Sequence, residues 1–185
     1  MNLALLKELE NLKKKQQSLS ARLAKKIDTK VEHSIAEAFH DFDRFFKENG
    51  FEVQLGERVV SASYGNLKAT LSYVVPEAPY AGSYFVFDLI LQLQGTTEYQ
   101  LLLIPKQQNL VAISYDAGKD PDQQIRQSID EVTASMKRTE ERIKNFSKDV
   151  WAFELRSKKQ KKKANRIIHD SVYELLTTIL TKEDE

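Results

Sequence analysis

The sequence predicts an α+β fold in which long helices flank an antiparallel sheet. Two long stretches carry apolar residues in alternating steps of four and three, which is the spacing of a helical seam. Between Phe51 and Tyr115 the apolar period changes to two, which is typical of strands with one buried face. We therefore expect a long N-terminal helix, a meander of five or six strands, a long heptad-patterned helix and a short C-terminal helix.

The composition favours a folded, soluble protein of one or two small units. The 185 residues are 41% hydrophobic and 30% charged, and 28 basic residues almost balance 27 acidic ones. A net charge of +1 gives no global attraction to nucleic acid or to a membrane. The chain has no cysteine, so disulfides and thiolate metal sites are excluded. No stretch has the length of a signal core or an apolar membrane span, and we expect a cytoplasmic protein with no membrane partner.

The first predicted unit, residues 1–29, is a coiled-coil-like helix. Gln16 stands at a position of its apolar seam, where a buried polar side chain favours one register. Near Asp28 and Thr29 the heptad order relaxes, so either the helix bends or a second helix begins there. The predicted interaction residues of this seam are Leu5, Leu9, Leu12, Leu19 and Leu23.

The second predicted unit, residues 30–120, joins a helix to the sheet. Several phenylalanines lie on one side of the helix, and Asn49-Gly50 is a strong stop signal. Turn residues divide the following segment into six candidate strands. These are 51–55, 59–64, 67–75, 85–93, 98–104 and 110–115.

Asp120-Pro121 has the residue types of a helix start, and the third predicted unit is a heptad helix over 121–157. A helix of that length is about 55 Å long, so part of its seam requires a partner. An even number of meandering strands would let both long helices pair as an antiparallel hairpin, or with copies in a second chain. The predicted interaction residues here are Ile125, Ile129, Val132, Met136, Ile143, Phe146 and Val150.

The fourth predicted unit, residues 158–185, joins a basic segment to a short amphipathic helix. The run from Arg156 to Arg166 has seven basic residues in eleven and no acidic one, so it is a candidate for non-specific contacts with phosphates. A solvated helix face or a docking site for an acidic protein explains the same run. The candidate nucleic-acid-binding residues are Arg156, Lys158, Lys159, Lys161, Lys162, Lys163 and Arg166.

Signals for catalysis are weak. His33, Glu37 and His40 share one side of a helix, but a di-iron site also needs two more carboxylates and a second Glu-x-x-His, and the chain has no second Glu-x-x-His. The six glycines form no phosphate-binding loop, and no nucleophile motif is present. We expect no catalytic residue, no metal site and no cofactor. Tyr80, between prolines at a predicted hairpin tip, is a further candidate interface residue.

The predicted function is that of a non-enzymatic interaction protein. It would be a structural or accessory subunit that oligomerises, or joins a larger assembly, through its helical seams. The alternative is a nucleic-acid-associated protein that makes non-specific contacts with DNA or RNA through the Arg156–Arg166 run. A small metalloenzyme around His33, Glu37 and His40 is the least favoured hypothesis.

Overall fold

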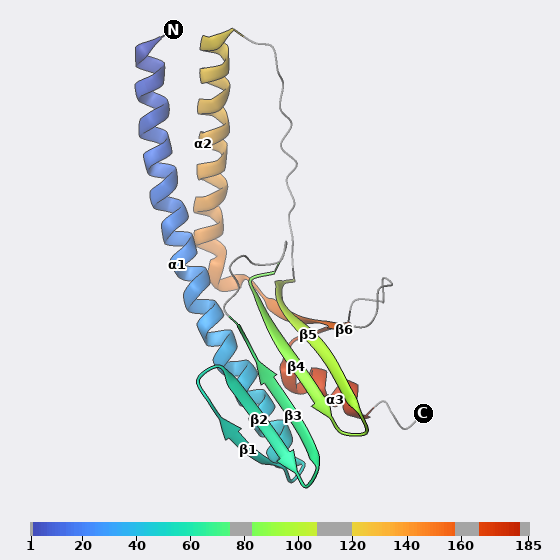
Figure 1. Cartoon of the computed structure of the whole chain (residues 1–185). Coiled ribbons are helices and arrows are strands. Elements are labelled where there is room, and N and C mark those ends of the chain that lie inside the picture. The colour runs from blue at the N-terminus through green and yellow to red at the C-terminus, as the bar shows by residue number, and fades with distance from the viewer. Residues whose placement is uncertain (1, 75–82, 107–119, 158–166, 182–185) are drawn as a thin grey trace. The chain divides into compact units, whose positions relative to one another are not determined.

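The computed structural model describes residues 2–74, 83–106, 120–157 and 167–181 (Figure 1). It confirms the α+β class, with a long N-terminal helix, an antiparallel sheet, a helix that begins at Pro121 and a short C-terminal helix. In chain order the elements are α1 (Leu3–Glu48), β1 (Glu52–Leu55), β2 (Val59–Tyr64), β3 (Leu67–Ser72), β4 (Phe85–Gln92), β5 (Thr96–Pro105), α2 (Pro121–Asn145), the 3-10 turn η1 (Phe146–Lys148), β6 (Trp151–Ser157), β7 (Ile167–His169) and α3 (Val172–Thr181).

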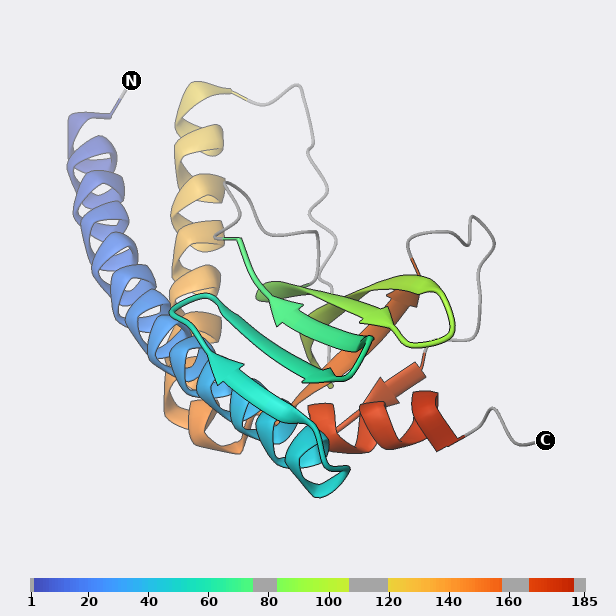
Figure 2. The same ribbon diagram turned by 60° about the horizontal axis from the view of Figure 1, so that its bottom comes forward.

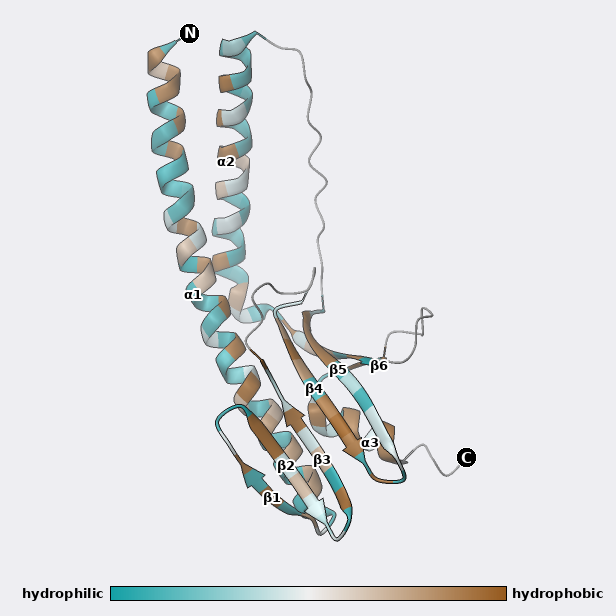
Figure 3. Ribbon diagram, in the orientation of Figure 1, coloured by the Kyte–Doolittle hydropathy of each residue, from teal (hydrophilic) through white to brown (hydrophobic). Residues whose placement is uncertain are grey.

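The chain forms two compact units, and α1 contributes to both. We call unit 1, Met1–Lys30 with Asn109–Asp149, the helical arm, and unit 2, Val31–Gln108 with Val150–Glu185, the sheet unit. α1 is a single 46-residue helix, so no second helix begins near Thr29. In Figure 3 the part of α1 in the arm is mostly hydrophilic, whereas β4 is strongly hydrophobic.

Among the described residues, the sheet unit has seven strands in sequential antiparallel order, from β1 at one edge to β7 at the other. The last part of α1 and α3 lie on the same face of this sheet (Figures 1 and 2). Phe87 of β4 is opposite Leu101 of β5, which is opposite Leu155 of β6, so these positions share that face. Fully buried side chains from the strands and from both helices form the core. They include Val60, Leu71, Phe87, Leu89 and Leu101 with Phe42, Phe46, Val172 and Leu175.

α1 ends where the sequence predicts, because glycine supplies the required backbone conformation. Gly50 has a positive φ of 80°, which a residue with a Cβ rarely adopts. The N–H of Phe51 donates to the carbonyl of Phe46 at 3.0 Å, and the N–H of Gly50 donates to that of Lys47 at 3.0 Å. These bonds satisfy two of the carbonyls that a helix end leaves free.

The third predicted unit is wrong at its C-terminal end. α2 ends at Asn145 and not at Ser157, and residues 151–157 form β6 between β5 and β7. Trp151, Phe153 and Leu155 alternate with Ala152 and with polar positions, which is a strand pattern. Phe153 also continues the four-three helical spacing of the preceding residues. That helical spacing concealed the period-two spacing of the strand. The predicted strand at 110–115 lies outside the described residues.

Candidate interaction surfaces

The two helices of the helical arm are parallel to each other. The N–H of Asn2 donates to Asp122 Oδ1 at 3.0 Å, and Gln16 Nε2 donates to Ser135 Oγ at 3.0 Å. The ammonium of Lys30 donates to the carbonyl of Asp149. The partners are 120, 119 and 119 residues apart, and an offset this constant along the chain requires both helices to run in the same direction.

The expected antiparallel hairpin is therefore wrong. That expectation counted six strands before the long helix. In the structure five described strands precede α2, and the next, β6, follows it. The strand count thus does not determine the direction of α2. Gln16, predicted to set the register, does pair across the arm with a polar side chain at a matching position.

The predicted seam residues that the structure describes lie in the helical arm, with the exception of Val150. Apart from Val150, none of them is exposed. Leu19 and Phe146 are buried, and the others are half-buried. Lys26 and Lys30 lie over the Phe146 ring, with their Nζ atoms 5.8 and 5.5 Å from its centroid. The half-buried residues are Leu5, Leu9, Leu12, Leu23, Ile125, Ile129, Val132, Met136 and Ile143.

One described interaction residue, Val150, does not belong to this seam. Val150 lies between η1 and β6, its side chain is 57% exposed, and its carbonyl accepts a hydrogen bond from the Lys106 N–H at 3.0 Å. It therefore belongs to the sheet unit, which corrects its assignment to the heptad seam. Tyr80 lies outside the described residues.

The basic run has one described member that contacts an acid. Arg156 is at the end of β6, and its Nε donates to Glu154 Oε1 at 2.9 Å. Glu154 is only 4% exposed, so this bond partly compensates a buried carboxylate. Arg156 thus has a structural partner within the strand. Lys158, Lys159, Lys161, Lys162, Lys163 and Arg166 lie outside the described residues.

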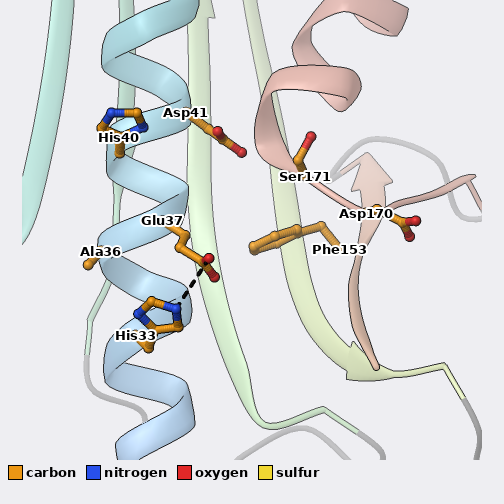
Figure 4. A pocket seen from close by; sticks show the side chains of 8 residues that line it. All are labelled: His33, Ala36, Glu37, His40, Asp41, Phe153, Asp170 and Ser171. Carbon is orange, nitrogen blue, oxygen red and sulfur yellow. Dashed lines mark ion pairs between the residues drawn. The ribbon is translucent and has the colours of Figure 1, made fainter. Parts of the chain in front are cut away.

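A polar cleft of about 470 Å³ lies in the sheet unit beside α1 (Figure 4). Its lining includes His33, Glu37, His40, Phe153 and Asp170. His33 Nε2 is 3.3 Å from Glu37 Oε1, but the His40 ring is not directed toward that pair. Across the described part of the chain, no group of three or more His, Asp or Glu side chains is placed to hold a metal ion.

Tyr173 connects α3 to the end of α1. Its hydroxyl donates to Glu48 Oε2 at 2.6 Å, and the Arg44 guanidinium lies 4.2 Å from the centre of its ring. The hydrogen bond to Glu48 raises the pKa of Tyr173 above its ordinary value of 10.0, because ionisation would remove the donated proton and place a second negative charge beside the carboxylate.

Replacing Glu48 with glutamine should lower the pKa of Tyr173 toward its ordinary value, because the negative charge disappears and the amide oxygen is a weaker acceptor than the carboxylate. The shift should appear in an alkaline absorbance titration compared with that of a Tyr173→Phe variant, which identifies the signal among seven tyrosines. The folded state therefore binds the hydroxyl proton of Tyr173 more tightly than the unfolded chain does. The stabilising contribution is therefore complete below pH 10 and is lost as the pH rises above it. An unchanged titration in Glu48→Gln would contradict this contact.

The fold and these surfaces define a two-unit α+β protein with a helical arm. Comparison with protein-family models, with curated proteins and with solved structures found no match. Among the described helices, none combines the length and the apolar character needed to cross a membrane.

Proposed function

We propose that this protein is a non-enzymatic interaction protein, an accessory or structural subunit whose helical arm is its docking element. The main support is that α2 is not buried within the chain. This 25-residue helix has a seam of isoleucine, valine and methionine, yet none of its residues is buried. By contrast, the part of α1 in the sheet unit buries Ala38, Phe42 and Phe46 almost completely.

Two paired helices shield their seams from one side only. The apolar residues of α2, among them Ile129, Met136 and Ile143, remain half-buried against α1. A second pair of helices would cover the remaining apolar surface, as in a four-helix bundle. We propose that a second copy of the arm supplies these helices, because one seam then serves both subunits in an isologous interface.

Enzymatic activity has less support. Catalysis needs a nucleophile or acid–base group that converges with a second group in a cavity. In the polar cleft the only described ion pair between lining residues is His33 with Glu37, and both side chains are largely exposed, at 72% and 62%. A reducing, cytoplasmic setting suits a chain without cysteine, and we include it in the proposal.

Glutamate at Ile129, Met136 and Ile143 should dissociate the assembly to a single-chain mass, measured by light scattering over a concentration series. Charges at the centre of an apolar interface are strongly unfavourable. The only tryptophan, Trp151, stacks on Tyr84 with ring centroids 4.4 Å apart in the sheet unit. Its fluorescence should stay unchanged, because the substitutions lie in the other unit.

The matched control places glutamate one residue further along α2, at Asp130, Lys137 and Lys144, which are all exposed. This variant should keep the mass of the unmodified chain. A single-chain mass for the unmodified protein at every concentration would contradict self-association. An unchanged oligomer mass in the Ile129, Met136 and Ile143 variant would contradict the assignment of the interface to the seam.

A further inference from the structure

The first half of α1 has a second surface beside the seam, which meets a seam residue only at Lys26, over the Phe146 ring, among the contacts that the structure describes. Residues 11–27 include six basic residues and no acidic one. At 100° per residue, five of the six fall within about 120° of the helix circumference, beside the seam. We call these five the basic stripe. They are Lys14, Lys15, Arg22, Lys25 and Lys26, and all five are exposed.

The basic stripe has no acidic partners in the part of the chain that the structure describes. Among the residues that the structure describes, no carboxylate lies within ion-pair distance of any of the five. The same helix behaves differently further along, where Lys47 pairs with Asp43 at 2.8 Å and Arg44 with Asp41 at 3.9 Å. Unpaired like charges three and four residues apart destabilise a helix, so an anionic ligand would relieve that repulsion.

The position of the seam argues against a lipid surface as the ligand. A helix that binds a membrane surface inserts its apolar side among the lipids and keeps its cations at the headgroups. Here the apolar side of α1 faces α2, as the bond between Gln16 and Ser135 shows. The apolar side chains of α1 are half-buried on the α2 side, whereas all five residues of the basic stripe are exposed, which suits a polyanion in water.

We propose that the basic stripe binds the phosphate backbone of a duplex nucleic acid without sequence preference. From Lys14 to Lys26 the stripe extends about 18 Å along α1 at ~1.5 Å per residue. A DNA duplex has one negative charge per ~1.7 Å of its axis, so about ten phosphates lie along that length. The stripe has no aromatic residue to stack on a base, and its cations cannot read the sequence without groove contacts.

This inference does not depend on the proposed self-association, since the basic stripe and the seam are different surfaces of α1. It also differs from the Arg156–Arg166 hypothesis, because it assigns the contact to other residues in the other unit. Substituting the residues of the basic stripe and those of the Arg156–Arg166 run in separate variants distinguishes the two hypotheses.

The test replaces Lys14, Arg22 and Lys25 with glutamine in the full chain and measures binding to a fluorescent DNA duplex by anisotropy over a salt series. Affinity at low salt should fall at least tenfold. Each neutralised phosphate contributes about 0.9 to the slope of log affinity against log salt, so the magnitude of the slope should fall by roughly 2 to 3. Circular dichroism should show unchanged helix content, because glutamine is a good helix former. The same assay with an RNA duplex distinguishes the two sources of phosphate.

A matched control removes three charges from α2 instead, with glutamine at Lys137, Arg138 and Lys144, where Glu140 and Glu141 lie nearby. This variant should bind almost as well as the unmodified chain. Equal loss in both variants would show an effect of net charge alone and would overturn the proposal. The proposal would also be overturned if affinity fell only on substituting Lys161, Lys162 and Lys163. Two further results would overturn it: binding to anionic phosphatidylserine vesicles but not to a duplex, and no binding of the unmodified chain to either duplex at low salt.

Discussion

Replacing Phe87 with alanine should lower the free energy of unfolding of the sheet unit by about 3–5 kcal/mol. Phe87 is fully buried on β4, the middle one of the seven strands that the structure describes. Its ring lies 5.1 Å from Phe85 and 6.0 Å from Phe153, centroid to centroid. Truncation removes buried apolar surface and leaves a cavity that rigid neighbouring rings cannot fill. Urea unfolding followed by Trp151 fluorescence measures the change in the same unit.

Leu55→Ala is the control for this prediction. Leu55 is also apolar and also on a strand, but it lies on the edge strand β1 with its side chain 66% exposed. Its truncation should change the free energy of unfolding by about 0.5 kcal/mol or less. If Phe87→Ala had an effect no larger than that of Leu55→Ala, the assignment of Phe87 to the centre of the core would be wrong.

Much of the fold could be predicted because local patterns determine it. Residues 85–91 of β4 alternate strictly between buried and half-buried, and the sequence has the matching alternation of apolar side chains. Gly50 ends α1 for a conformational reason that concerns a few neighbouring residues. Pro121 begins α2 for the same kind of reason. Each signal lies within the element that it specifies.

Other features depend on contacts between distant residues. The segment 151–157 has both a four-three spacing and an alternating one, and pairing with β5 and β7 selects the strand. The direction of α2 relative to α1 is evident from hydrogen bonds between residues 119 and 120 positions apart, which no periodicity reports. The polar cleft combines Glu37 with Phe153 and Asp170, which are more than a hundred residues away in the sequence.

The two surfaces differ in how visible they are in the sequence. Apart from Val150, the described residues predicted for the seam are buried or half-buried in the arm, because the apolar period reports one side of each helix. The direction of the two helices could not be predicted in this way. The basic stripe was hidden by the total charge. Residues 11–27 have a local charge of +6, yet the whole chain sums to +1 because acidic residues elsewhere cancel it. A window of charge along each helix, rather than a total, is the signal that would have found it.

Replacing Ser18 with proline should disrupt the helical arm and leave the sheet unit folded. Ser18 is exposed in the middle of the arm part of α1, and proline there removes a helical hydrogen bond and clashes with the preceding turn, at a cost of about 3 kcal/mol or more. α2 has no buried residue of its own, so once α1 is broken it has little to keep it helical. Circular dichroism should therefore show a large loss of helix content.

The tryptophan signal separates this outcome from general unfolding. The sheet unit uses α1 only from Val31 onward, and its core residues on that helix begin at Ala38, far beyond the break. The urea midpoint of Trp151 fluorescence should therefore match that of Ser18→Ala, which keeps the helix and loses only a hydroxyl. If the fluorescence midpoint instead fell together with the helix signal, the two units would unfold as one, and α1 would transmit the loss of the arm into the sheet.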